Sequence, residues 1–159
     1  IASERVRVDK ESLESHRDSM ASDSAQDFAQ AVLYHCLKSG DRSELEKLFA
    51  PYCVSLLAPN VVSGRNGVLD QWDCWRTGLS DAKFTVDHVC HNSAFDHEQH
   101  IAARWSLSGR HSGELIGIAA TNNPVFVLGI THWRIVAGKI SSEWNVVDRL
   151  GVLTQLLRD

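Results

Sequence analysis

Asp148 and His132 are the two side chains of this sequence whose type and position best suit acid/base chemistry. Asp148 stands at an even spacing from Ile140, Trp144 and Val146, so a continuous strand would place it on their apolar face. A carboxylate that loses water on such a face has a raised pKa, which brings it into the range useful for proton transfer. Because Asp148 also directly precedes an apolar helical stretch, the alternative is that it caps a helix.

His132 lies in the middle of a predicted strand, and its ordinary pKa near neutrality suits a base or a polarising donor. The turn that follows at residues 137–138 decides where it points. A two-residue turn places Thr131 and Trp133 on the face of Trp144 and turns His132 away, and a three-residue turn reverses this. The alternative is a histidine at the solvent or at an interface.

Arg104, Arg134 and Glu143 form a third group of charged residues on the predicted strands. Glu143 could pair with either arginine across the sheet. One interpretation is a network that orients the catalytic acid, and the other is an ordinary ion pair on the solvated face. The residue types favour the second interpretation.

The stretch from residue 88 to residue 111 is rich in histidine, with His88, His91, His97, His100 and His111. None of these has the helical spacing of H-E-x-x-H, and the stretch is typical of strands and a loop, so we expect no metal site. The sequence also lacks G-x-S-x-G, phosphate-loop and G-x-G-x-x-G patterns. Serine hydrolysis, nucleotide phosphate binding and dinucleotide chemistry are therefore unsupported.

Five tryptophans are many for a chain of 159 residues. Most would ordinarily belong to the core, but in a hollow fold some inward aromatic faces must line the cavity, where they suit a flat ligand. Trp144 is the best candidate for the cavity wall. The other predicted substrate-binding residues are Trp133, Thr131, Trp105 and Trp72.

The elements that position these residues are predicted from hydrophobic periodicity. Apolar stripes indicate helices over residues 24–40, 43–49 and 68–79, the second beginning at a Ser43–Glu46 capping box. Strands are indicated over 53–57, 84–91, 101–107, 125–136 and 140–147, with a loop over 59–66 and a short helix or last strand over 149–157. Helices first and long antiparallel strands second indicate an α+β fold, a curved sheet with helices on one face around a pocket.

Length and composition limit the class of protein. The chain has 159 residues, 43% of them hydrophobic and 23% charged, which is typical of one globular domain. We expect residues 1–22 to form a flexible arm and residues 23–159 to form the domain. The net charge of −4 argues against a nucleic-acid partner. No apolar run approaches the ~20 residues that span a bilayer, which argues against a membrane protein.

Cysteine usage and exposed apolar residues bear on location and assembly. The four cysteines have no C-x-x-C spacing and indicate reduced thiols. Together with a polar start that lacks a signal peptide, they predict a cytoplasmic protein. Phe126 and Leu128 lie on a predicted strand, and an apolar sheet face outside the pocket must be covered, so we expect a homodimer.

The sequence resembles the SnoaL-like polyketide cyclase family of ester cyclases over most of residues 30–157. The family motifs A-x-R-W-x-L-x-G-x-H-x-G-E, G-x-x-P-T, G-K-I-x-E-x-W-x-x-x-D and L-x-Q-L recur in order and with similar spacing. They match Ala102–Leu115, Gly117–Thr121, Gly138–Asp148 and Gly151–Leu156. The sequence departs from the family at Ala120, where Pro is usual, and at Asn145, where Asp is common; residues 54–57 also lack a histidine that many members carry.

The resemblance implies a cone-shaped α+β barrel, as in scytalone dehydratase and nuclear transport factor two. It implies an intramolecular aldol cyclisation of an apolar, polyketide-like carbonyl compound without cofactor or metal. Asp148 matches the last acidic position of the family motif and would be the acid/base residue, with His132 as its helper. The same fold also hosts isomerases, dehydratases and epoxide hydrolases, and a non-catalytic small-molecule binding module is a further alternative.

Overall fold

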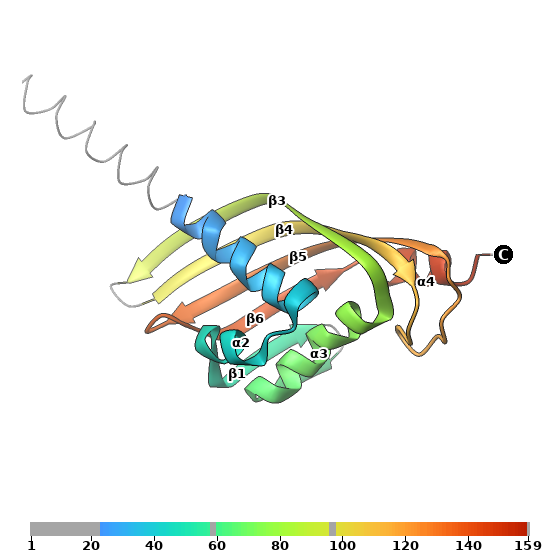
Figure 1. The fold of residues 1–159 in the computed structure, drawn as a ribbon. Coiled ribbons are helices and arrows are strands. Elements are labelled where there is room, and N and C mark those ends of the chain that lie inside the picture. Colours follow the sequence, from blue (N-terminus) through green and yellow to red (C-terminus); the bar gives the residue numbers. More distant parts are fainter. Residues whose placement is uncertain (1–22, 58–59, 96–97, 159) are drawn as a thin grey trace, which may run out of the picture.

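The computed structural model describes residues 23–57, 60–95 and 98–158, and the predicted arm at residues 1–22 lies outside this part (Figure 1). Residues 23–34 are helical and continue into the short π-helix η1 (His35–Ser39), which ends at Gly40 with a positive φ of 62°. The inner face of this first helix buries Val32, Leu33 and Leu37, as the apolar stripe predicts.

Two further helices precede the long strands, and a fourth follows them. They are α2 (Arg42–Leu48), α3 (Arg65–Gly78) and α4 (Arg149–Leu156). The predicted Ser43–Glu46 capping box is wrong, because Asp41 caps α2 and its carboxylate accepts hydrogen bonds from the backbone amides of Ser43 and Glu44. An aspartate two residues earlier satisfies the same free amides of the first turn.

The strands form one sheet of six in the order β2-β1-β6-β5-β4-β3. Their bounds are β1 (Phe49–Leu57), β2 (Asn60–Ser63), β3 (Leu79–Phe95), β4 (Glu98–His111), β5 (Pro124–Val136) and β6 (Lys139–Val147). Only β1 and β6 run parallel, so the sheet is mixed, and it stays open with β2 and β3 at its edges. The predicted α+β class is confirmed, whereas the predicted loop over 59–66 contains the edge strand β2 and the start of α3.

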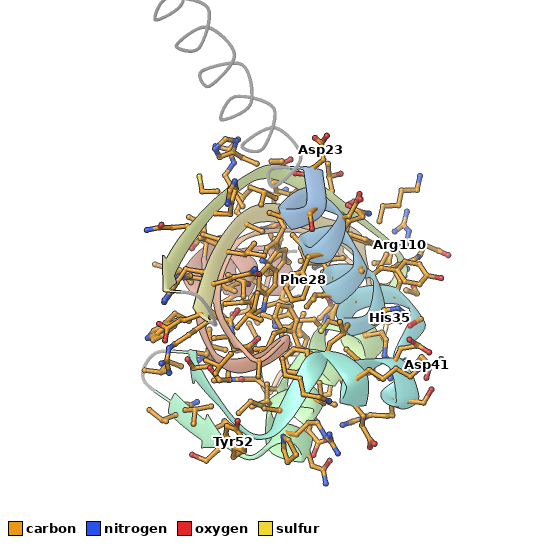
Figure 2. All side chains as sticks on the ribbon, turned by 90° about the vertical axis from the view of Figure 1, so that its left-hand side faces the viewer. Asp23, Phe28, His35, Asp41, Tyr52 and Arg110 are labelled. Carbon is orange, nitrogen blue, oxygen red and sulfur yellow. The ribbon has the colours of Figure 1, made fainter. Side chains whose placement is uncertain are left out.

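The sheet curves around the first helix and α3, which cover its concave face (Figure 1). Seen along the strands in Figure 2, Phe28 points from the first helix into the space that the strands enclose. Its ring meets the indole of Trp133 edge to face, with centroids 6.2 Å apart. The core therefore lies between these helices and the concave face of the sheet.

A β-bulge in β6 sets which residues point into that core. The turn between β5 and β6 has two residues, Ala137 and Gly138, both with positive φ. Beyond it, the strands pair normally up to Ile140, but Ser141 has no partner on β5 and Ser142 takes the next position. One extra residue reverses the inward and outward positions of the rest of the strand.

Because of this bulge, the observed register of β6 differs from the predicted one. A two-residue turn without a bulge would place Trp144 opposite Thr131, on the inner face. Instead, Trp144 lies opposite His132 on the outer face, and Glu143 lies opposite Trp133 on the inner face.

Candidate active site

Glu143 is a carboxylate completely buried between the sheet and α3. Its Oε1 accepts hydrogen bonds from the Ser55 hydroxyl at 2.8 Å, the Trp72 indole at 3.0 Å and the Asn145 amide at 2.9 Å. Its Oε2 accepts from the Trp133 indole at 3.3 Å. Side chains from three strands, β1, β5 and β6, and from the helix α3 thus converge on one acidic group.

Burial dominates the electrostatics of this carboxylate. Desolvation raises the pKa of Glu143, and its four hydrogen-bond donors oppose the rise without cancelling it. All four donors are neutral, and no Lys or Arg in the described ranges forms an ion pair with it. An acidic group that exchanges its proton above the ordinary Glu range suits general acid/base chemistry.

Asn145 links Glu143 to a second layer of polar groups. The hydroxyl of Thr131 donates to Asn145 Oδ1 at 2.7 Å, and the indole of Trp105 donates to Thr131 at 2.9 Å. These bonds orient the Asn145 amide so that its NH₂ group faces the carboxylate. Gly129 permits this geometry, because a Cβ there would collide with the Trp105 ring that lies across it.

A small cavity of about 10 Å³, roughly the room that one water molecule needs, lies beside this network. Its lining is mainly aromatic and aliphatic, with two side-chain amides, and consists of Leu57, Gln71, Trp72, Trp75, Trp105, Asn145 and Val147. It is far smaller than the ~300–1,000 Å³ typical of ligand pockets, so its wall side chains would have to move apart to admit an organic ligand. Trp72 and Asn145 both line the cavity and bond Glu143, so the carboxylate lies one side-chain layer behind its wall.

A second and larger hollow, of about 230 Å³, opens at the N-terminal end of the first helix. Ser24 and Phe28 border it from the helix, and Asn92 and Gln99 border it from β3 and β4. No carboxylate is among the residues that line it. This hollow therefore lacks the buried acid that distinguishes the cavity beside α3.

The structure brings four of the predicted substrate-binding residues to one place. Trp72 and Trp105 line the cavity, and Thr131 and Trp133 belong to the hydrogen-bonded network behind it. The expectation that Trp144 forms the cavity wall is wrong, because its indole lies on the outer face and is 38% exposed.

Asp148 does not occupy the desolvated position expected from strand periodicity. β6 ends at Val147, and Asp148 is the exposed N-cap of α4, where its carboxylate accepts a hydrogen bond from the Gly151 amide at 2.9 Å. The capping alternative therefore describes its local structure. Its assignment as the acid/base residue stays a prediction, but without the burial on which that prediction depended.

His132 lies on the outer face of β5, away from the cavity. Its Nε2 lies 3.0 Å from Nδ1 of His100, whose Nε2 in turn contacts Glu98 at 2.9 Å. Partial burial, and secondarily the neighbouring His100, lower the pKa of His132. A role as a catalytic helper stays a prediction that this position does not favour.

The favoured interpretation of Glu143 as a surface ion pair is wrong. Arg134 instead bonds Glu98 at 2.6 Å, and Arg104 lies 4.0 Å from Asp87. Sequence reasoning also missed Ser55 and Asn145 as partners of Glu143. The available signal was the spacing of Glu143 and Asn145 by two residues, but the bulge that turns both inward has no clear sequence signature.

In the part of the chain that the structure describes, no three His, Cys, Asp or Glu side chains are grouped so that they could hold a metal ion. Among the residues that line the cavity, Gln71 and Asn145 carry side-chain amides and none carries a charge. No helix among the described residues has the length and apolar character needed to cross a bilayer.

The family model of SnoaL-like polyketide cyclases matches residues 25–156, which is most of the chain. The chain belongs to this family. Comparison with curated proteins finds no match. The predicted family resemblance is thus confirmed, and its match includes every residue of the cavity and of the Glu143 network.

Solved structures agree with this assignment. The SnoaL-like chain is 26% identical to TsrD from Streptomyces laurentii, with a TM-score of 0.70 over 84% of this chain and 95% of that one. It is 27% identical to IdmH from Streptomyces antibioticus, described as a candidate polyketide cyclase, with a TM-score of 0.64 over 83% and 97% of the two chains. AclR from Streptomyces galilaeus, described as a candidate hydroxylase, shares the fold at 20% identity and a TM-score of 0.69, covering 85% and 96%.

Proposed function

We propose that this SnoaL-like protein catalyses an intramolecular aldol cyclisation of an apolar, carbonyl-bearing small molecule in the cavity beside α3, with Glu143 as the group that exchanges the proton. The observation that carries the proposal is the completely buried Glu143 carboxylate, held by neutral donors directly behind an aromatic cavity. Burying a charge without a cation costs stability, and such a cost is typical of groups that serve chemistry.

The reaction needs only proton transfer and a new carbon–carbon bond. A base removes a proton from a carbon next to a carbonyl, and the enolate carbon then bonds a second carbonyl carbon of the same molecule. The π electrons of that carbonyl move to its oxygen, which takes up a proton and becomes a hydroxyl. Atoms and charge balance without an oxidant, a reductant or a further reactant.

The surroundings of Glu143 support this role. The indoles of Trp72 and Trp105 make the cavity wall apolar, and an apolar environment strengthens the interaction of a carboxylate with a proton on carbon. Oε2 has the weaker hydrogen bonds, at 3.3 Å from Trp133 and from Trp72, so it is the oxygen with capacity left for a substrate proton. A small movement of the Trp72 indole would connect this oxygen to the cavity.

The test is exchange of carbon-bound protons for deuterium in an aromatic β-keto methyl ester, followed by NMR. Exchange reports proton abstraction even when the added ester does not cyclise. We expect the wild-type protein to accelerate exchange and Glu143→Gln to lose at least about 100-fold of that rate, the lower bound of a general-base contribution. Glu114→Gln, which neutralises an exposed carboxylate, is the matched control and should keep the rate.

The pH profile of the wild-type protein keeps the proposal testable if Glu143→Gln does not fold. The base must be ionised, so exchange should rise with pH through a pKa above the ordinary Glu value of ~4.3. Asp148→Asn and His132→Gln test the two residues predicted from sequence. Exchange that persists in Glu143→Gln but disappears in Asp148→Asn would overturn our assignment, and saturable binding without any exchange would indicate a binding module.

We also propose that the protein is a homodimer that pairs the outer faces of β5 and β6. Five large apolar side chains are exposed on this face: Phe126, Leu128, Ile130, Trp144 and Val146. Apolar residues that gather on one sheet face are typical of an interface, and in a two-fold dimer the same face of both copies meets. The neighbouring Arg134 and Glu98 offer both signs of charge to a second copy.

Light scattering after size-exclusion chromatography tests the dimer. We expect twice the monomer mass of 17.7 kDa for the wild-type chain and a monomer for Ile130→Asp, because a charge would be buried without a partner. Tyr52→Asp, at an exposed aromatic on β1, is the control and should leave the mass unchanged. A wild-type chain that still has the monomer mass at about 100 times the protein concentration of the deuterium-exchange assay would reject the dimer.

A further inference from the structure

The hydroxyl of Thr131 connects two members of the buried network, and its neighbours fix the direction of its hydrogen. The indole nitrogen of Trp105 can only donate, and it donates to Thr131 Oγ1 at 2.9 Å. The single hydrogen of Thr131 is therefore free to point to the Asn145 amide, 2.7 Å away. The amide atom that receives this hydrogen must be the oxygen, Oδ1. The NH₂ group of Asn145 then lies on the opposite side, toward Glu143.

The direction of this amide decides how the two oxygens of Glu143 differ. Asn145 Nδ2 donates to Oε1 at 2.9 Å, and the Ser55 hydroxyl and the Trp72 indole donate to the same oxygen at 2.8 Å and 3.0 Å. Among the residues that the structure describes, Oε2 accepts only bonds of 3.3 Å, from Trp72 and Trp133. An oxygen that faces three close donors cannot carry a hydrogen without losing one of them, so the proton of the neutral acid belongs on Oε2.

The other titratable groups that act on Glu143 leave this difference in place. They are the thiols of Cys36, on the first helix, and Cys53, on β1. Burial, and secondarily Glu143 itself, raises the pKa of both thiols, to about 11 for Cys53, so both are neutral near pH 7. The hydrogen-bond partners that Glu143 has on α3, β5 and β6 are neutral donors as well. The direction of neutral dipoles therefore decides where the proton lies.

We propose that Thr131 is a positioning residue: by fixing the direction of the Asn145 amide, its hydroxyl confines the transferable proton of Glu143 to Oε2. The inference rests on the proposed function for the use of that proton, but the place of the proton can be measured without any reaction. Without the hydroxyl, Asn145 Oδ1 loses its donor, and the amide can turn this oxygen toward Glu143. The neutral acid would then donate from Oε1 to Oδ1, which stabilises the protonated form.

The test compares Thr131→Val, which removes the hydroxyl and keeps a similar shape, with Thr131→Ser, which keeps the hydroxyl. Infrared difference spectra of the full-length protein between low and high pH contain the carbonyl stretch of neutral Glu143, identified as the band that Glu143→Gln lacks. The pH dependence of this band gives the pKa of Glu143. Thr85→Val, at an exposed threonine on β3, is the matched control.

We expect the pKa of Glu143 to rise by about one to two units in Thr131→Val, which corresponds to one lost hydrogen bond to a charged group. The frequency of the carbonyl stretch should rise too. In the wild type the carbonyl oxygen of the neutral acid is Oε1, with three close donors, and in the variant it becomes Oε2, with two long bonds. Thr131→Ser and Thr85→Val should match the wild type. The midpoint of the pH profile of deuterium exchange should move upward with the pKa.

An unchanged pKa and an unchanged stretch in Thr131→Val would overturn the inference, and Thr131→Ala gives the same reading if Thr131→Val does not fold. Equal shifts in Thr131→Ser would also overturn it, because lost packing rather than the lost hydroxyl would then be responsible. A raised pKa with an unchanged stretch would show that the proton stays on Oε2 without the hydroxyl, which contradicts the inference. If the spectra change as expected but the protein exchanges no deuterium, the inference stands and the proposed reaction fails.

Discussion

The two faces of β5 and β6 carry ionisable groups in opposite environments. On the inner face, Glu143 is completely buried and held by neutral donors. On the outer face, Glu98 bonds both Arg134 and His100, and this pairing lowers its pKa to about 2. Solvent and charge partners, rather than residue type, therefore decide which carboxylate has a raised pKa and which has a lowered one.

The two tryptophans of these strands show the same contrast in packing. Trp133 is fully buried beside Glu143, whereas Trp144 lies outside against His132, with ring centroids 5.2 Å apart. We expect Trp133→Ala to lower the free energy of unfolding by about 3–5 kcal/mol, the cost of a large cavity in a core. Trp144→Ala should cost about 1 kcal/mol in the monomeric Ile130→Asp background, because a half-exposed side chain buries little area in the single chain. Urea unfolding of both variants measures the difference, and equal losses would contradict the inward and outward assignment.

A substitution at Gly129 tests whether the inner face has room for a methyl group beside the Trp105 ring. Gly129→Ala places a methyl group against the Trp105 ring and should cost about 1–3 kcal/mol of unfolding free energy. The double variant with Trp105→Phe should recover part of this loss, because the smaller ring leaves room for the methyl group. Purely additive losses in the two single variants and the double variant would show that the two residues do not constrain each other.

The pH dependence of the free energy of unfolding tests whether burial raises the pKa of Glu143. Its folded-state pKa lies above the unfolded value, so the folded chain binds more protons and stability falls as pH rises from about 4.5 through the folded-state pKa. In Glu143→Gln this decline should be absent. Urea unfolding at several pH values, with wild type and variant side by side, measures the change. Parallel curves would mean that Glu143 titrates normally.

The smallest predicted effect on stability comes from His132, which lies on the outer face of β5. Its pKa is lowered by partial burial and by His100, so the unfolded chain binds the additional proton. Its contribution to stability is therefore complete above about 6.5 and is lost as pH falls through the lowered pKa. NMR titration should find this pKa below that of a free histidine, and His100→Gln should raise it. A pKa at or above the free value would contradict the prediction.

Much of the architecture could be predicted from periodicity because each element buries one stripe of side chains. The stripes of the first helix and of α3 placed Val32 and Trp72 in the core, and the alternation around Trp105 placed its neighbours on β4. The site was less accessible to prediction. Asp148 matched a family motif and a strand period, but the strand ends one residue before it.

The sequence by itself determined the order of helices and strands, the α+β class and the family, because these follow from local hydrophobic periods and from motif spacing. Only the tertiary structure decided which acidic side chain is buried. The reason is Ser141: a single unpaired residue in β6 reverses the direction of every side chain after it in that strand, turning Glu143 into the core and Trp144 out of it. The alternation of apolar and polar residues in the strand does not indicate which residue is left unpaired.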